Sequence, residues 1–599
     1  MNPPPRHRVA LLGASGVLLL LALLLADWNW ARPAVVRYLE HTSKREIQAD
    51  DLQIRLDADW QPVVRLRNLR VANAPWASGD RPFITAREAS FTFDWASLFS
   101  DVRVMRKMHL VEADIDLQRR PDGVRNWRLT RPDDRGRGRL RIHRLQAERS
   151  RLTLIHGGIG LTLEARSTPL SQPREGYAQQ VDFRGRYGGA DWAGQAETGA
   201  VLSMVDTAER FALRGQARSG GTTLALQGQV ANLLQLTVVE AQVQVRGETL
   251  SQLQPFLQRV PWPDSRPYRF EGRLVREGST WAAHDARLSL GRSDLRGEAR
   301  YTPARTQRDR RAVLHAQVKS ERLRLEDLPS RNGIGAAAAA SAPSATHVLP
   351  QRELPLDALR ALDGRITLQA EQLEAPSWPA ARDLHAVATL EGGTVRVQLQ
   401  RGELGGGRWQ GRFSIDTHAR EPEATLQLQA RGVKLPQLWP ALTRQPGVRW
   451  PAVDGELKLS ALGPTLASWW RGVDGQLDLR FTGGSLPKKL DARLGLHAGR
   501  MLGSLIGGDQ PVPIRCGAVS LAFKGGVGRT QLLVLETERT QVQGSGSVRL
   551  ADERWDLVLT PEAHGGVLPA SIVAEGSFRG LKVELAQREQ VPASHARCA

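Results

Sequence analysis

The feature that most constrains this chain is an alternation of apolar and polar residues, which begins near Arg45 and continues for hundreds of residues. Apolar residues stand at every second position in short runs, as in Leu52-Gln53-Ile54 and Leu161-Thr162-Leu163. A helix repeats every 3.6 residues and would not produce these pairs, whereas a strand points successive side chains to opposite faces. Turn signals such as Pro121-Asp122-Gly123 separate the runs. The pattern predicts a mainly β, mostly antiparallel protein whose sheet has one apolar face.

Several of the predicted strands carry a glycine in the middle, as at Gly297, Gly411 and Gly544. A glycine inside a strand marks a bulge or a sharp bend. Repeated bends would curve a long sheet in one direction. Segments with helical spacing are scarce: the sequence predicts a short helix over 33–43 and another over 490–505. Few helices would therefore be available to cover the sheet.

The apolar face of a sheet must be hidden from water, and the sequence leaves two solutions open. In one, the strands close into a sandwich or several small barrels, and the apolar face is an ordinary core. In the other, a long curved sheet keeps an open apolar groove, which needs an apolar occupant such as acyl chains. For such a groove, the paired apolar positions predict a lining of Val64, Leu66, Phe91, Phe93, Ile115 and Leu117.

A second feature is the uncharged apolar run Val9–Ala26, which as a helix would span roughly 27 Å, close to the hydrocarbon core of a bilayer. Arg6 and Arg8 precede this run, and Asp27 follows it. The positive-inside rule therefore predicts a single-pass anchor, with residues 1–8 in the cytoplasm and the bulk of the chain on the other side of the membrane.

Two tryptophans, Trp28 and Trp30, directly follow the apolar run, where an aromatic belt at the membrane interface is expected. A cleaved signal peptide is the alternative interpretation. Cleavage after Ala26 would need a small residue three positions earlier, and Leu24 stands there. Both interpretations send the rest of the chain across the membrane.

The charge of the chain has two interpretations. The formal net charge is +19, and the arginines are scattered at alternate positions rather than clustered. This spacing is typical of the solvated outer face of a sheet, and the alternative is attraction to anionic lipid headgroups. Nucleic acid is not expected as a partner beyond a membrane helix.

The sequence contains no pattern typical of an enzyme or a metal site. A phosphate-binding Gly-Lys-Ser/Thr loop, a His-Glu-x-x-His helix and a Gly-x-Ser-x-Gly elbow are all missing from it. The two cysteines, Cys516 and Cys598, are too few for a zinc site, although they could pair in an oxidising compartment. The sequence therefore predicts a protein without catalytic residues, metal or cofactor.

Several segments carry a resemblance to a known family. They are Asp27–Trp30, Pro33–Leu39, Lys44–Ile47, Val71–Ala77 and Asp122–Trp127 near the N-terminus, with Leu502–Gly508 and Val512–Cys516 near the C-terminus. In these segments the chain resembles the AsmA family of envelope proteins from Gram-negative bacteria. The resemblance is dense over about 27–130 and 485–585.

The resemblance implies an inner-membrane anchor followed by a long periplasmic β-groove, since relatives of the family resemble bridge-like lipid transfer proteins with repeating β-groove units. It implies phospholipids as ligands and transfer across the periplasm that contributes to outer-membrane lipid homeostasis and envelope biogenesis. An outer-membrane or periplasmic protein partner is expected. The alternative function is a non-enzymatic envelope scaffold that assists the assembly of outer-membrane proteins.

The predicted organisation follows from these features. It comprises a cytoplasmic N-terminus (1–8), an anchor (9–26), an AsmA-like N-terminal region (27–130), a repeated β-groove region (131–484) with a flexible loop at 332–349, an AsmA-like C-terminal region (485–585) and a disordered tail (586–599). The loop is predicted from its run of alanines with serine and proline, which lacks apolar anchors.

Overall fold

A computed structural model describes residues 28–587, apart from short gaps and the longer stretches 129–138, 257–263, 305–310, 328–359, 439–448 and 488–510. The fold is mainly β, with 70% strand and few helices. This confirms the fold class predicted from the alternating pattern.

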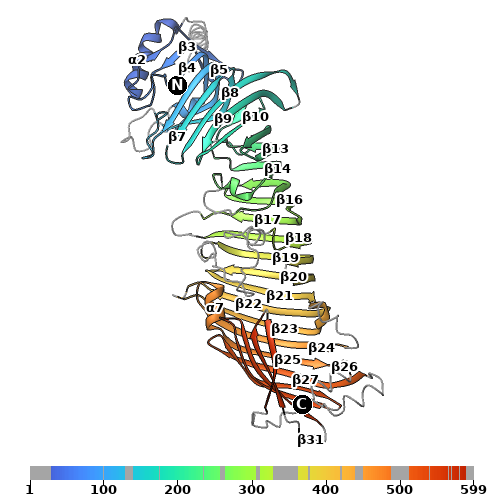
Figure 1. The fold of residues 1–599 in the computed structure, drawn as a ribbon. Coiled ribbons are helices and arrows are strands. Elements are labelled where there is room, and N and C mark those ends of the chain that lie inside the picture. Colours follow the sequence, from blue (N-terminus) through green and yellow to red (C-terminus); the bar gives the residue numbers. More distant parts are fainter. Residues whose placement is uncertain are drawn as a thin grey trace, which may run out of the picture. The chain divides into compact units, whose positions relative to one another are not determined.

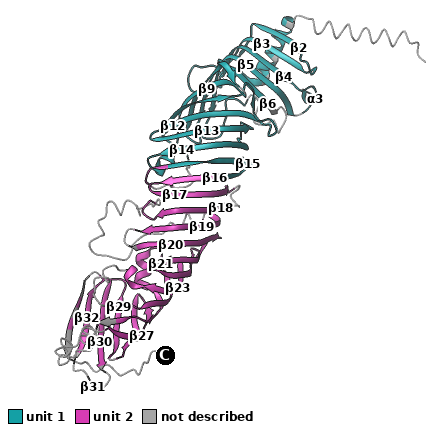
Figure 2. Cartoon of the chain, turned by 90° about the vertical axis from the view of Figure 1, so that its right-hand side faces the viewer, with its two compact units in different colours: residues 1–262, 269–283 teal, residues 263–268, 284–599 magenta. Residues whose placement is uncertain are grey.

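The chain divides into two compact units (Figure 2). Unit 1 comprises residues 1–262 and 269–283, and unit 2 comprises residues 263–268 and 284–599. The division passes through two consecutive strands, β15 (Tyr268–Glu277) and β16 (Thr280–Leu290). Each unit has a buried apolar cluster of its own.

Most strands of unit 1 pair with the strand before them in the sequence (Figure 1). The strands are β1 (Ile47–Gln48), β2 (Asp51–Leu56), β3 (Pro62–Val71), β4 (Ile84–Phe93), β5 (Val102–Arg119), β6 (Arg139–Glu148), β7 (Arg151–His156), β8 (Leu161–Arg174), β9 (Tyr177–Tyr187), β10 (Ala190–Thr198), β11 (Leu202–Ser203), β12 (Phe211–Ser219), β13 (Thr222–Ala231) and β14 (Val238–Gly247). These pairs are antiparallel, except that β5 runs parallel to both β6 and β7.

In the described part of unit 1, four helical segments accompany these strands: η1 (Trp28–Trp30), α2 (Arg32–Ser43), α3 (Trp95–Leu98) and η2 (Leu250–Leu253). Helix α2 confirms the helix predicted over 33–43, with a proline in its first turn and a left-handed residue, Lys44, at its C-terminal end. Val35 and Val36 of α2 pack on a cluster of β1–β5 residues that includes Leu52 and Leu110, which are 1% and 0% exposed. This helix therefore covers the apolar face of the first strands.

Two central strands of unit 1 contain a residue with left-handed backbone, Asn68 in β3 (φ +51°) and Glu112 in β5 (φ +53°). Such a residue breaks the strict alternation of side chains along a strand. Leu66 and Leu69 consequently both lie in the buried cluster, although they are three positions apart. A strict period of two would have placed one of them on the polar face.

The strands of unit 2 also follow each other in chain order (Figure 1). They are β17 (Ser293–Thr302), β18 (Ala312–Arg324), β19 (Leu362–Ala375), β20 (Trp378–Glu391), β21 (Thr394–Leu404), β22 (Gly407–Asp416), β23 (Glu423–Lys434), β24 (Ala452–Leu462), β25 (Asp474–Thr482), β26 (Ser485–Pro487), β27 (Pro511–Lys524), β28 (Val527–Thr537), β29 (Thr540–Arg549), β30 (Arg554–Ala563), β31 (Gly566–Val567), β32 (Ala570–Ser577) and β33 (Gly580–Gln587). The pairing of β18 with β19 is parallel, and the other pairings within this unit are antiparallel.

The sheet of unit 2 curls so that its apolar face lies on the inside. Leu390 and Val395, from β20 and β21, share one cluster with Phe523 and Val548, from β27 and β29. These strands are far apart in the pairing order, so only a curled sheet brings their side chains together. In Figure 1 the last strands of the unit cross in front of the earlier ones, near α7 (Leu466–Gly472).

Several predictions concern residues outside the described part of the chain. They are the anchor at 9–26, the loop at 332–349, the helix predicted over 490–505 and the tail beyond Gln587. Among the helices that the structure describes, none combines the length and the apolar character needed to cross a bilayer.

Candidate functional site

The inner face of unit 2 carries a row of apolar residues that runs across neighbouring strands. Leu399 of β21 stands opposite Gly411 of β22, which stands opposite Leu428 of β23, and Leu428 stands opposite Leu457 of β24. Residues directly opposite each other in antiparallel strands point to the same face. We call Leu399, Gly411, Leu428 and Leu457 the central row.

The central row remains partly exposed, although its leucines are apolar. Leu399, Leu428 and Leu457 are half-buried, and their chain neighbours Gln427 and Lys458 on the opposite face are exposed. The sheet therefore has one apolar and one polar face here, as the alternating pattern predicts. Exposure of this leucine row to water is unfavourable, and covering the row with an apolar group would lower the free energy of the system.

One end of the inner face is closed by helix α7. Trp469 of α7 is 9% exposed, and its indole N–H donates a hydrogen bond of 2.9 Å to the carbonyl of Gly463. The ring of Phe413 lies 6.1 Å from the ring of Trp469, measured between centroids. The hydroxyl of Thr465 caps the helix by accepting a hydrogen bond from the amide of Ser468 at 3.0 Å. These contacts hold the tryptophan over the strand ends.

A second, smaller cluster lies toward the other end of the same strands. Val433 and Val453 are 3% and 6% exposed, and Leu435 and Leu438 of α6 (Leu435–Leu438) pack against them. The leucines of the central row belong to neither this cluster nor the cluster around α7. The central row is thus a partly exposed apolar strip between two packed ends.

Glycines on the inner face allow neighbouring strands to approach closely. A Cβ atom built on Gly411 would lie 2.5 Å from the carbonyl oxygen of Gln427 and 2.9 Å from Cδ1 of Leu428. A Cβ atom on Gly297 would collide with the carbonyl of Gln317 in the paired strand. Both are among the mid-strand glycines that the sequence marks as bends, and neither site has room for a side chain.

Unit 1 has a comparable half-buried apolar face on β8–β14. Phe183 of β9 is opposite Gly194 of β10, and Ala217 of β12 is opposite Leu224 of β13. The rings of Phe183 and Trp192 lie 5.2 Å apart between centroids. Phe183, Trp192, Ala217 and Leu224 are half-buried, as the leucines of the central row are. We therefore include two apolar strips in the candidate site: the central row of unit 2, and these residues of β9–β13 in unit 1.

The lining predicted from sequence lies on the first strands of unit 1. Val64 of β3 is opposite Phe91 of β4, and Leu66 is 8% exposed within the cluster beneath α2. Val64, Phe91 and Ile115 pack against that cluster. The structure therefore brings these residues together around the core that α2 covers.

Two further predicted lining residues, Phe93 at the end of β4 and Leu117 of β5, are half-buried and lie outside this cluster. Leu117 stands beside Leu154 of β7. A lipid-lining role for these residues stays a prediction. The central row was missed because residues of unit 2 repeat the same alternation with no local signal that singles them out.

Buried amides join the two turns that carry the N-terminal family resemblance. Asn126 is 0% exposed, and its amide group donates hydrogen bonds to the side-chain oxygen of Asn73 (3.0 Å) and the carbonyl of Asp116 (2.7 Å). Its own side-chain oxygen accepts a hydrogen bond from the amide of Gln118 at 2.8 Å. Since buried polar groups need partners, this network explains why polar residues stand in those turns. The network fixes the fold rather than a reaction centre.

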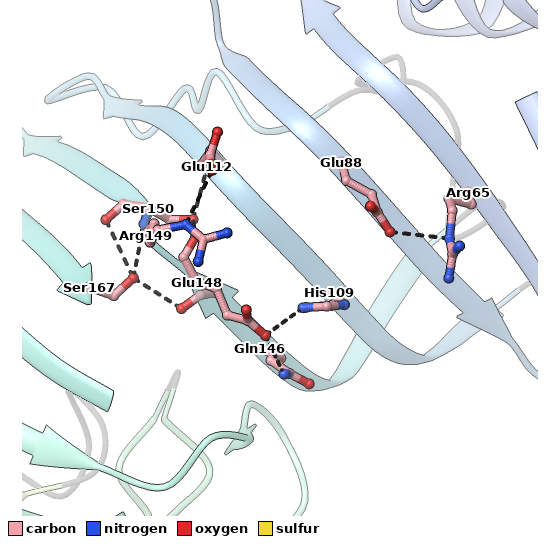
Figure 3. Close-up of polar contacts among 11 residues, drawn as sticks. Arg65, Glu88, His109, Glu112, Gln146, Glu148, Arg149, Ser150 and Ser167 are labelled. Atoms are coloured by element: carbon pink, nitrogen blue, oxygen red, sulfur yellow. Dashed lines mark hydrogen bonds and ion pairs between the residues drawn. The ribbon is translucent and has the colours of Figure 1, made fainter. Parts of the chain in front are cut away.

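The polar face of unit 1 carries ion pairs between neighbouring strands (Figure 3). Arg65 lies 3.2 Å from Glu88, and Arg149 lies 3.2 Å from Glu112. His109 lies 2.9 Å from Glu148. Burial raises the pKa of Glu148, but hydrogen bonds from His109 and Gln146 outweigh burial and bring this pKa below its ordinary value. Cross-strand pairing of this kind accounts for part of the scattered arginine.

The remaining site residues predicted from sequence have separate positions. Trp28 and Trp30 both belong to η1, where Trp30 is 76% exposed, while Cys516 lies on β27. Cys598 lies outside the described residues, so its pairing with Cys516 stays a prediction. No group of three or more metal-binding side chains occurs in the described part of the chain.

Comparison with known proteins finds similarity to one family. Residues 284–533 match the AsmA family. The chain is also similar to the AsmA family protein YhjG of Escherichia coli (strain K12), with 25% identity over 424 residues, which cover 67% of this chain. The matched part spans 61% of the length of that relative. No solved structure matches the chain.

Proposed function

Because the chain carries an AsmA family domain, we propose that it binds phospholipids by their acyl chains and transfers them along its apolar strips. The observation that carries this proposal is the central row, in which Leu399, Leu428 and Leu457 are only half-buried between two packed ends of a curled sheet. The row lies within the matched residues 284–533.

The chemistry of the inner face suits acyl chains better than polar ligands. Each methylene group that leaves water for an apolar surface contributes about 0.8 kcal/mol. Burying a phosphate headgroup on the same face without polar partners would cost several kcal/mol of desolvation free energy. The headgroup is therefore expected to stay in water. A lipid held in this way can move along a row of similar strands without any bond being made or broken, which requires no catalytic residue.

We further propose the setting of this activity. The chain is expected to be held in the bacterial inner membrane by residues 9–26, with its bulk in the periplasm and a partner protein at or near the outer membrane. Phospholipid transfer there would contribute to outer-membrane lipid homeostasis and envelope biogenesis. The apolar run before η1 and the similarity to the AsmA family protein YhjG support this setting.

The proposal is tested by placing a charge on the central row. The variant Leu428→Asp should lose phospholipid that copurifies with the full chain, because an ion on the row would have to be desolvated against an acyl chain. The matched control is Gln427→Asp, one residue away on the exposed face. Bound lipid is measured by mass spectrometry, and stability is measured by thermal unfolding.

We expect Leu428→Asp to melt close to the unmodified chain while its bound lipid falls to background. A chain that carries no phospholipid at all, or that keeps its lipid in the Leu428→Asp variant, would contradict the conduit. Collapse of the fold in this variant alone would show a closed core and would favour the scaffold function instead.

A further inference from the structure

Two exposed tryptophans meet at one tip of unit 1. Trp60 lies in the turn between β2 and β3, and Trp95 begins helix α3. Their exposed fractions are 64% and 47%. Tryptophan is highly buried on average in a monomeric fold, so two neighbouring indoles with this much exposure indicate a surface that contacts something else.

The structure holds the two tryptophans next to each other. The indole N–H of Trp95 donates a hydrogen bond of 2.6 Å to the backbone carbonyl of Trp60, and the backbone N–H of Trp95 donates one of 3.2 Å to the side chain of Gln61. The turn itself is fixed by Asp57, whose carboxylate accepts hydrogen bonds from the amides of Asp59 and Gln61 at 2.9 and 2.8 Å. The pair is therefore a rigid feature of the hairpin tip.

The backbone of Trp60 adds an independent indication. Its φ is +59°, a left-handed conformation that glycine and asparagine adopt readily and a bulky residue does not. The fold alone would be served better by glycine at this position. A strained residue that is also exposed is typical of a functional contact.

The tip lies on the same edge of unit 1 as the start of the described chain. Asn29 of η1 donates a hydrogen bond of 2.7 Å to Asp51 and accepts one of 2.9 Å from the amide of Leu52, at the start of β2. Strand β2 then leads to the turn that holds Trp60, so the tip is about 20 Å from this attachment. The residues before η1 are the uncharged run Val9–Ala26.

We propose that Trp60 and Trp95 form a second contact with the lipid bilayer, at the headgroup level of the membrane that the N-terminal run is expected to cross. An indole combines an apolar ring with one N–H donor, which suits the boundary between acyl chains and water. With Trp30 at one point of the β2 edge and this pair at another, the edge would be held along the membrane surface. The contact does not depend on lipid binding by the central row.

The test uses a photoreactive benzoylphenylalanine at Ala58, which is exposed in the same turn. The full chain is reconstituted in vesicles of phosphatidylethanolamine and phosphatidylglycerol that carry a tagged phospholipid. We expect a lipid adduct at position 58, and none at Leu462, a matched control position of unit 2 that is 54% exposed. In the Trp60→Gly background the adduct at position 58 should fall to the level of that control.

Thermal unfolding of the Trp60→Gly variant distinguishes a membrane contact of the Trp60 side chain from a role in stabilising the fold. Because glycine relieves the left-handed backbone, Trp60→Gly should melt at the same temperature as the unmodified chain or above it. Adducts at position 58 that persist in Trp60→Gly, or that are missing from the start, overturn the proposal. A parallel reporter at Leu428 distinguishes the two proposals, because its adduct reports the central row and should survive Trp60→Gly.

Discussion

The first strands of unit 1 and the central row of unit 2 share the same alternating pattern, yet their apolar faces have different environments. In unit 1, helix α2 covers the face, and Leu110 is fully buried. In unit 2, the described helices that contact the inner face lie at its two ends, and Leu428 between them is only half-buried. A closed core and a partly open apolar strip thus occur in one chain.

The difference follows from what packs against the face rather than from the strands. Val35 and Val36 of α2 supply apolar side chains to the unit 1 cluster. The central row instead belongs to neither of the clusters against which α6 and α7 pack, and Gly411 adds no side chain of its own to the row. Whether an alternating strand builds a core or a binding surface therefore depends on a second element far away in sequence.

Among variants that test the difference between the two faces, we expect Leu110→Asp to cause the largest loss of stability. An unpaired carboxylate in the closed core would destabilise unit 1 by several kcal/mol, comparable to the stability of a whole domain. Leu428→Asp, in the open strip, should change stability much less. Urea unfolding of both variants in the full chain measures the difference, and equal losses would show that the two faces are equally closed.

A smaller effect is expected from Gly411→Ala. The added methyl group must displace the Gln427 backbone or Leu428, which should destabilise the chain by about 1–3 kcal/mol. Gly472 at the end of α7 is the matched control, because no atom lies within 4 Å of a Cβ built there. Gly472→Ala should be nearly neutral in the same thermal unfolding experiment. If Gly411→Ala were as mild as the control, close strand approach would not shape the inner face.

The smallest effect concerns the contact between Asn29 of η1, the segment just before the covering helix α2, and strand β2. A hydrogen bond from Asn29 lowers the pKa of Asp51 below its ordinary value of 3.8. The carboxylate is thus favoured in the folded state, so its contribution is complete above the unfolded pKa and is lost as the pH falls through the folded value. We expect this contribution to be below about 1 kcal/mol, because partly exposed polar contacts stabilise little.

The variant Asn29→Ala tests this attachment through its pH dependence. The difference in unfolding free energy from the unmodified chain should be constant at neutral pH and shrink below the ordinary pKa of Asp51. A residual difference should remain, since Asn29 also accepts a hydrogen bond from Leu52. A difference that grows toward acidic pH would contradict the direction of the shift.

Local patterns predicted the elements of the fold well. Phe91 and Phe93 lie on one strand, Ile115 and Leu117 on another, and the helix expected over 33–43 is α2. The kinks at Asn68 and Glu112 were not predicted, because left-handed backbone at these residues depends on neighbouring strands rather than on local sequence. Helix α7 was also missed, although Thr465 and Ser468 at its start form a capping pair that sequence could have indicated.

The sequence predicts that the candidate site is an apolar sheet face, but it does not predict which residues of that face remain uncovered. The sequence indicates that one sheet face is apolar, and the mid-strand glycines indicate where strands approach closely. It cannot show that Leu66 is covered while Leu428 is only half-buried, since the cover over Leu66 comes from a helix about thirty residues earlier. The same limit applies to the exposed pair of Trp60 and Trp95, which only the folded hairpin brings together.

The chain-order pairing of the strands has a consequence for how such a protein is made. In unit 2 the strands β20–β23 and β28–β30 each pair with their immediate predecessor through a short connection. Short loops close at low entropic expense, and contacts that are local in sequence form fast. The sheet can therefore grow one strand at a time from the end synthesised first. At each step the growing edge is a ready template for the next strand, and it would equally be one for a foreign strand until the chain is complete.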